Sequence, residues 1–139
     1  MNVTDIPFNK FIEITTTNPG EVGLELEFKT NLKNHLGTFH ASAQFALAEA
    51  CSGQLLQNHF SHLENGVVPV LRKSDVKFKR PAQSKIFANA TIDADTKVKF
   101  ETQLEKNGRA IITVPVEIVD NDGAVTMTGT YEWFIQKLG

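Results

Sequence analysis

Cysteine, histidine clusters and long apolar runs are all scarce in this sequence of 139 residues. The single cysteine, Cys51, cannot form an internal disulfide, and its apolar surroundings indicate a small core residue rather than a nucleophile. His59 and His62 stand three residues apart with no cysteine or second pair near them, so we expect no metal site. No uncharged segment approaches the roughly 20 apolar residues of a membrane helix, and the N-terminus lacks the features of a signal peptide. We therefore expect a cytoplasmic protein without a membrane partner.

The chain also has little net charge. The formal net charge of −2 and the isoelectric point near 6.1 give no general reason to expect nucleic acid or an anionic membrane as a partner. Hydrophobic residues make up 41% and charged residues 22% of the sequence, which is ordinary for a soluble globular protein. Because a chain of this length can bury one complete core, we predict a single domain over residues 1–139.

Charge is almost missing between Lys33 and Glu64, where only Glu49 is charged when histidine is counted as neutral. The segment 34–56 predicts a tight loop and then a helix that is apolar on nearly all sides, and the rest of the protein must surround such a helix. Helical spacing places small residues on the face of Glu49, namely Ser42, Ala46, Ser52 and Gly53. A solvated glutamate is the simpler interpretation, but the small neighbours leave room for a ligand and favour a functional site.

Alternating apolar residues predict strands on both sides of this helix. The predicted strands cover residues 22–28, 67–78, 86–92, 98–104, 110–118 and 125–135. Arg72 and Ser74 interrupt the second of these, which indicates a β-bulge or two polar groups that point into a site. Turn signals occur at Asn18-Pro19-Gly20, Asn107-Gly108 and Asp120-Asn121-Asp122-Gly123. We predict an α+β fold in which a curved antiparallel sheet surrounds one long helix, with exposed edges that favour dimerisation.

The residues around the helix match a known signature. Asn34 lies six residues before His40, and Glu49 lies nine residues after it, with Phe45, Leu47 and Ala48 between them. Here the sequence resembles the Asn, His-Gly-Gly and Leu-Ala-Asp signature of hotdog-fold acyl-CoA thioesterases, in particular the phenylacetate-pathway type. The resemblance is strong over residues 31–56. Beyond that, Arg80-Pro81-Ala82 resembles the family's strand ending, and the later strands match in pattern only.

This resemblance implies a hotdog fold and hydrolysis of a thioester. Glu49 would act as nucleophile or as general base on water, and a largely apolar pocket would raise the pKa of its carboxylate toward the range that suits a base. The Ala41 N–H at the helix start would stabilise the negative charge that develops on the thioester oxygen. Asn34 would hold the attacking water or the carboxylate. His40, which we expect to be neutral, would cap the helix or orient the substrate.

The sequence departs from the family pattern at three points. Ala41 and Ser42 replace the two glycines, so side chains narrow the closest approach of a thioester. Glu49 replaces aspartate, which moves the carboxylate outward by one methylene group. The helper Ser or Thr of some relatives would fall at Leu71, and Ser74 lies near it but on the other phase of the strand. These departures motivate a second hypothesis, a non-catalytic acyl-CoA-binding or regulatory hotdog protein.

Basic residues gather between positions 72 and 85, where six of them accompany one acid, Asp75. The six are Arg72, Lys73, Lys77, Lys79, Arg80 and Lys85. This group is either a solvated strand face or a site for the phosphates of coenzyme A, and we favour Lys79, Arg80 and Lys85 for the phosphate contacts. Ser42 and Phe45, beside Glu49 on the helix, complete the expected substrate contacts.

The leading prediction is a homodimer, or a dimer of dimers, that hydrolyses an acyl-CoA or a related thioester. It requires no cofactor, and coenzyme A enters only as part of the substrate. A hotdog dehydratase or hydratase is a third candidate, but the histidine-and-proline context that those families resemble is absent around His35 and His40. The acyl group stays open, because the aromatic residues can line pockets of many shapes.

Overall fold

The computed structural model describes residues 1–17 and 23–139. Its helices, 3-10 helices (η) and strands follow in the order η1 Val3–Asp5, α1 Pro7–Phe11, β1 Thr15–Thr16, β2 Leu24–Leu26, η2 Thr30–Leu32, α2 Ala41–His59, η3 Ser61–Leu63, β3 Val67–Phe78, β4 Ile86–Ala90, α3 Ala94–Asn107, β5 Arg109–Asp120 and β6 Val125–Lys137. The predicted turn Asn18-Pro19-Gly20 and the first residue of the predicted strand 22–28 lie outside the described residues. In the part of the chain that is described, no helix has the length and apolarity needed to span a bilayer.

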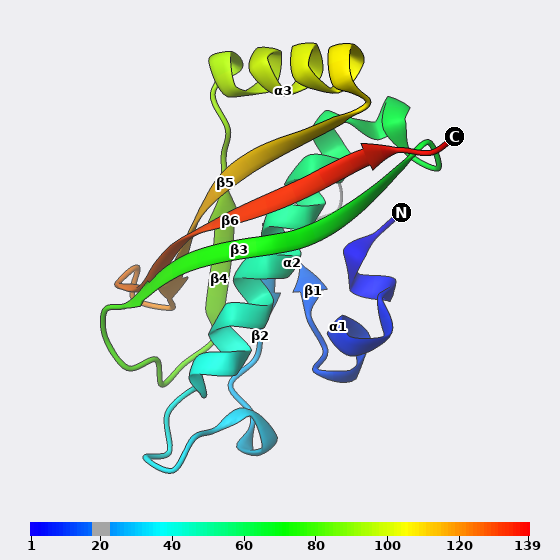
Figure 1. The fold of residues 1–139 in the computed structure, drawn as a ribbon. Coiled ribbons are helices and arrows are strands. Elements are labelled where there is room, and N and C mark those ends of the chain that lie inside the picture. The colour runs from blue at the N-terminus through cyan, green and yellow to red at the C-terminus, as the bar shows by residue number, and fades with distance from the viewer. Residues whose placement is uncertain (18–22) are drawn as a thin grey trace.

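The strands form one antiparallel sheet in the order β1-β2-β4-β5-β6-β3. Helix α2 lies against one face of this sheet, and the long strands pass over it (Figure 1). The helix is buried on almost every side, and its core residues include Ala46, Leu47, Ala48, Ala50, Cys51 and Leu55. Glu49 is half-buried among them. The prediction of an α+β fold with a sheet wrapped around one long apolar helix is therefore confirmed.

Residues 94–107 form the helix α3, so the predicted strand 98–104 was wrong. Phe100 and Leu104 are 2% and 3% exposed, whereas Val98 is 60% exposed. A strand would place all three side chains on one face, but a helix separates Val98 from the pair that lies four residues apart. The helix begins at an N-cap in which the Asp93 carboxylate accepts a hydrogen bond from the Thr96 N–H at 2.7 Å. The spacing of Phe100 and Leu104 is compatible with a strand and with a helix, and the N-cap at Asp93 favours the helix.

Asn107-Gly108 ends α3 and does not turn a hairpin, so this prediction was also wrong. Gly108 has a φ of +73°, and its N–H donates to the carbonyl oxygen of Leu104 at 2.9 Å. A left-handed residue directly after the last turn is a common helix C-cap, which glycine adopts without steric cost. The turn predicted at residues 120–123 is confirmed between β5 and β6, where the Asp120 carboxylate accepts from the N–H groups of Asp122 and Ala124 at 2.9 and 3.0 Å.

β3 lies at one edge of the sheet and pairs, within the described chain, only with β6. The pairing register shifts after Leu71 and leaves Arg72 without a partner, so the predicted β-bulge is confirmed. Leu71 lies opposite Trp133, and Ser74 lies opposite Tyr131. Because directly opposed residues share a face, both point toward the helix. Ser74 is therefore on the same face as Leu71, and the prediction that it lies on the other phase was wrong.

Helix α3 crosses one end of the sheet, near the C-terminal end of α2 (Figure 1). The Phe100 ring packs against Phe60, which follows the last residue of α2, with ring centroids 4.8 Å apart. The core is closed at this end by α3. The opposite end, where α2 begins, is bordered by loops.

Candidate active site

The first turn of α2 leaves one backbone donor unused. His40 is the N-cap, and its Nδ1 accepts a hydrogen bond from the Ser42 N–H at 2.9 Å. The carbonyl oxygen of His40 accepts from the N–H groups of Ala43 and Gln44 at 2.9 and 3.3 Å. The Ala41 N–H has no acceptor among the described residues, and both Ala41 and Ser42 are exposed. Since the first N–H groups of a helix carry partial positive charge, the exposed Ala41 N–H is an available anion donor.

The sheet and its loops hold this helix start in place. The Phe39 N–H donates to the carbonyl oxygen of Ala82 at 2.8 Å, which attaches the residue before the N-cap to the loop between β3 and β4. Gln44, in the first turn, accepts a hydrogen bond from the Thr126 hydroxyl at 2.8 Å, and both side chains are buried. A buried polar pair is stabilising only when it is satisfied, so this bond fixes the helix against β6. The Ala41 N–H is therefore positioned before any ligand arrives.

Glu49 lies two turns further along α2 and has no hydrogen-bond or ion-pair partner for its carboxylate in the described part of the chain. Burial raises the pKa of this carboxyl group above its usual value of 4.5. Tyr131, on β6, is fully buried, and its pKa is raised first by burial and then by the nearby charge of Glu49. Glu49 is thus a half-buried carboxylate near a phenol ring, and among the described residues no cation forms an ion pair with it.

Two aromatic residues near Glu49, Phe45 and Tyr131, are held against each other. The Tyr131 hydroxyl donates to the backbone oxygen of Phe45 at 3.2 Å, and the two rings lie with centroids 5.3 Å apart. Phe45 is one turn before Glu49 on the same helix. The structure therefore brings together two of the predicted residues, Phe45 and Glu49. It adds Tyr131, which sequence analysis included only as a strand residue.

Asn34 is used inside its own loop. Its Oδ1 accepts hydrogen bonds from the N–H groups of Leu36 and Thr38 at 2.9 and 3.0 Å, and its Nδ2 donates to the Thr38 hydroxyl at 2.9 Å. No hydrogen bond joins Asn34 to Glu49 in residues 1–17 and 23–139. The observed role of Asn34 is to shape the loop that leads into α2, and a contact with the attacking water stays a prediction.

Lys79 and Arg80 lie close to the start of α2. Their N–H groups both reach the carbonyl oxygen of Thr126, at 2.8 and 3.4 Å, and Thr126 also binds Gln44 of the first helical turn. Both basic side chains are exposed and have no ion-pair partner among the described residues. Two free cations therefore border the end of the helix that carries the unused Ala41 N–H.

Lys85 differs from the other basic residues of the loop. Its Nζ lies 3.0 Å from a carboxylate oxygen of Glu25 and 3.2 Å from one of Glu27. These two acids, with Glu25 first, raise the pKa of Lys85. An ammonium group held by two carboxylates is a weaker attractor of phosphate than a free one. The sequence could not reveal this, because the partners lie about sixty residues away on and just after β2.

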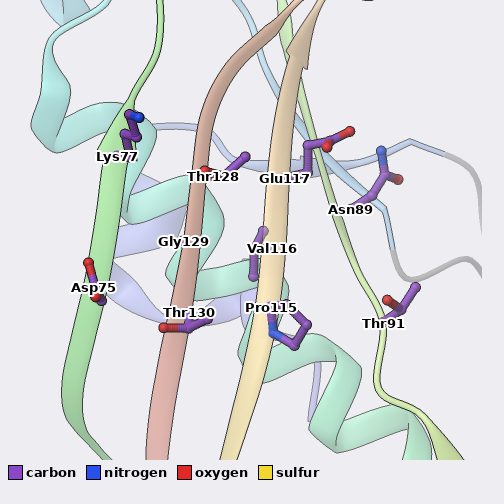
Figure 2. A pocket seen from close by; sticks show the side chains of 10 residues that line it. All are labelled: Asp75, Lys77, Asn89, Thr91, Pro115, Val116, Glu117, Thr128, Gly129 and Thr130. Atoms are coloured by element: carbon purple, nitrogen blue, oxygen red, sulfur yellow. The ribbon is translucent and has the colours of Figure 1, made fainter.

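A separate hollow of about 640 Å³ lies on the sheet away from α2. Figure 2 shows its side chains on β3, β5, β6 and the β4 region, with helix α2 behind the strands. Its lining includes Asp75, Lys77, Glu117, Thr128 and Thr130, and none of the predicted site residues. No group of three or more His, Cys, Asp or Glu side chains suited to a metal occurs within the described ranges. The site residues predicted from the sequence therefore lie apart from this hollow.

Solved structures of other proteins share this fold. A structure described as a probable thioesterase of unknown function from Pseudomonas aeruginosa is 24% identical, covers 98% of this chain and 91% of its own, and has a TM-score of 0.81. A thioesterase from Haemophilus influenzae is 19% identical with a TM-score of 0.72, over 98% of this chain and 87% of its own. A Bacillus halodurans protein solved with CoA is 17% identical with a TM-score of 0.69, over 96% and 85%. The chain is a hotdog-fold protein, as predicted.

The family is given by the sequence. Residues 6–135 match DUF4442, described as a domain of unknown function, and the chain belongs to this family. No protein with a curated description matches the sequence. The structural neighbours establish the hotdog fold at low sequence identity, and the narrower resemblance to phenylacetate-pathway thioesterases stays a prediction.

Proposed function

We propose that this protein hydrolyses an acyl-CoA thioester. The observation that carries the proposal is that one buried helix bears both an unused N–H donor at Ala41 and an unpartnered carboxylate of raised pKa at Glu49. These are the two groups that acyl transfer to water needs, a base and an oxyanion donor. A neighbouring structure described as a probable thioesterase and another solved with CoA support the same chemistry.

In the proposed reaction, Glu49 removes a proton from a water molecule as that water attacks the thioester carbon. The carbonyl oxygen becomes negative and accepts a hydrogen bond from the Ala41 N–H. The intermediate then collapses, the carbon–sulfur bond breaks, and the proton held by Glu49 passes to the departing CoA thiolate. The products are a carboxylic acid and the free thiol. A raised pKa suits this role, because the carboxylate must accept a proton in one step and release it in the next.

We further propose that the active protein is a homodimer, or a dimer of dimers, with a shared site. Ala41 and Glu49 are eight residues apart on α2, which is about 12 Å along the axis. For one thioester to contact both the Ala41 N–H and the Glu49 carboxylate of the same helix, the Glu49 side chain, the water and the carbonyl group would have to lie in an extended line. A site that combines Glu49 with Ala41 of the partner subunit avoids this requirement. The free edge of the twelve-residue β3, with Val68 and Val70 at 44% and 51% exposure, supports pairing of two copies.

The phosphates of coenzyme A are proposed to bind Lys79 and Arg80. Both are exposed, have no ion-pair partner in the described chain and border the helix start where the thioester oxygen would lie. Arg presents a planar fork that matches phosphate oxygens. We expect Arg80→Ala to raise KM several-fold with little change in kcat. Lys85→Ala is the matched control, because its ammonium group is already held by Glu25 and Glu27.

Two substitutions test the chemistry. Glu49→Gln removes the base without changing shape, and we expect kcat to fall by about 10² to 10⁴ on any acyl-CoA that is turned over. Ala41→Pro removes the proposed oxyanion N–H at the first helical position, which tolerates proline, and His40 already has the extended backbone that precedes a proline, with φ −65° and ψ 139°. We expect a loss of about 10² to 10³ in kcat with the fold intact. Thiol release that is unchanged in Glu49→Gln would refute the proposal.

Mixing these variants tests the shared site. Consider a dimer that combines one Glu49→Gln chain with one Ala41→Pro chain. If each site is shared across the interface, one of the two sites combines the native Glu49 of one chain with the native Ala41 of the other, and the second site has neither. Co-expression should therefore restore about one quarter of wild-type activity, since half of the dimers are mixed and one of their two sites is complete. A site made within one chain would show no restoration.

Asn34 favours a second candidate function, binding of an acyl-CoA without hydrolysis. Its amide groups are used inside the loop, so among the described contacts Asn34 is not held in position to bind a water against Glu49. This candidate predicts that the wild-type protein binds acyl-CoA with no thiol release. Calorimetry with a non-hydrolysable thioether analogue, run beside the hydrolysis assay, separates the two.

A further inference from the structure

A cavity of about 570 Å³ runs beside the C-terminal half of α2, between the helix, the N-terminal segment and the start of β3. Its lining is mostly apolar and includes Val3, Ile6, Leu56, Phe60, Trp133 and Ile135. Glu64, a carboxylate of the lining, is paired with the amino group of Met1. The cavity is therefore suited to an apolar group of some length and offers little to a charged one.

The cavity follows the helix face that carries Glu49. Gly53, Leu56 and Phe60 stand four, seven and eleven positions after Glu49, and residues at these spacings share one side of a helix. At the rise of an α-helix, the cavity begins about 6 Å from Glu49 along the axis and extends to about 16 Å. Glu49 lies just outside the lining, so a chain attached to a carbonyl group at Glu49 would reach the cavity at Gly53, one helical turn further on.

Trp133 and Gly53 both line the cavity, and Gly53 is the lining residue of α2 that is nearest to Glu49 in the sequence. The Trp133 indole N–H donates to the Ser52 hydroxyl at 2.9 Å, and that hydroxyl donates to the backbone oxygen of Glu49 at 2.7 Å. The indole is therefore fixed to the helix at the turn that carries the carboxylate. A methyl group added at Gly53 would lie 3.6 Å from the indole ring and 3.7 Å from Val3, at ordinary contact distance. Gly53 therefore leaves space for about one methyl group between the helix, the indole ring and Val3.

We propose that this cavity binds the acyl chain of the substrate, and that Gly53 and Trp133 limit its length and width. This inference rests on the proposed function, since it makes the substrate a straight-chain acyl-CoA. A cavity that is mostly apolar and extends along the helix beside an indole ring suits an unbranched alkyl chain. It rejects a polar or charged acyl group, which would lose its hydration without gaining a partner. Burial of each methylene group increases affinity by about fourfold until the cavity is full.

The test measures kcat/KM for a series of straight-chain acyl-CoAs, from acetyl-CoA to about sixteen carbons. In the wild-type protein the value should rise with each added methylene and then level off or fall. Gly53→Ala should move the optimum to shorter chains, so that the ratio of kcat/KM for long chains to that for short chains falls. Thr102→Ala, on the exposed side of α3, is the control and should keep the wild-type profile. Because Ile6 is 37% exposed at the cavity, Ile6→Trp should fold normally and also shorten the preferred chain.

The inference would be overturned if kcat/KM did not depend on chain length in the wild type, or if both variants kept the wild-type dependence. In either case, the observed hydrolysis would still support the proposed function. If no acyl-CoA is hydrolysed, the proposed function fails, and the cavity is tested by binding alone. Decanoic acid should then bind with a change in the fluorescence of Trp133, the single tryptophan, and Gly53→Ala should weaken the affinity. Equal affinity in both proteins would overturn the inference. If gel filtration showed that Ile6→Trp no longer forms a dimer, the cavity would be part of the contact with a second copy of the chain. That result would also overturn the inference that the cavity binds an acyl chain.

Discussion

Replacing Phe100 by alanine should destabilise the protein strongly, because this residue attaches α3 to the core. Its side chain is 2% exposed and packs against the Phe60 ring at the end of α2. Truncation of a buried phenylalanine costs about 3 to 5 kcal/mol, since apolar area and packing contacts are both lost. For 139 residues the unfolding entropy is about 0.3 kcal/mol per kelvin, so Tm should fall by about 10 to 17 °C.

The matched control is Val98→Ala on the same helix. Val98 is 60% exposed, so we expect a change within about 0.5 kcal/mol. The pair is informative because residues 98 and 100 would share one face of a strand but are separated by a helix. Unfolding in urea, followed by circular dichroism, gives both free energies at constant slope. Equal losses in the two variants would refute the helical assignment of residues 94–107.

Three further outcomes are expected. Gly108→Ala should cost about 1 to 2 kcal/mol in urea unfolding, because Gly108 has a φ of +73° at the end of α3. Ser52→Ala removes the acceptor of the Trp133 indole N–H and should cost about 1 to 3 kcal/mol, with a shifted tryptophan emission spectrum as the direct readout. Glu49→Gln should be more stable than wild type at pH 8 and equally stable near pH 4. The raised pKa means that the folded state holds the proton more tightly, so ionisation destabilises the fold above this pKa and has no effect below the unfolded value of 4.5. A Tm difference that is independent of pH would contradict this last prediction.

The central helix could be predicted because one signal dominates it. A long segment with a single formal charge must be buried, and it is buried as α2. The region 94–107 carries two conflicting signals. Phe100 and Leu104 fit an alternating pattern and a helical one, and the hairpin signal at Asn107-Gly108 is also a helix C-cap. The structure identifies Asp93 as the N-cap of α3, and an aspartate at this position is a helix-start signal that the prediction of a strand did not include.

The positions of the candidate residues could be predicted where they depend on one helix, and not where they depend on contacts between distant segments. The placement of Ala41 at the start of the helix and of Glu49 two turns later depends only on their positions in the segment that forms α2. The pairing of Lys85 with Glu25 and Glu27 depends on how β2 lies beside β4, which no local pattern encodes. The face occupied by Ser74 depends on a single bulge at Arg72, and one inserted residue reverses the phase of everything after it.

The stability of Glu49 variants separates a functional carboxylate from a structural one. An acid that holds the fold together, such as Asp93 at the start of α3, accepts hydrogen bonds that lower its pKa, and its removal destabilises the protein. Glu49 has the opposite environment, because burial raises its pKa and no described residue compensates the charge. Glu49→Gln should therefore increase stability at neutral pH while it removes thiol release, and Asp93→Asn should do neither. A variant at Glu49 that lost both stability and activity together would assign this carboxylate to the architecture of the fold rather than to chemistry.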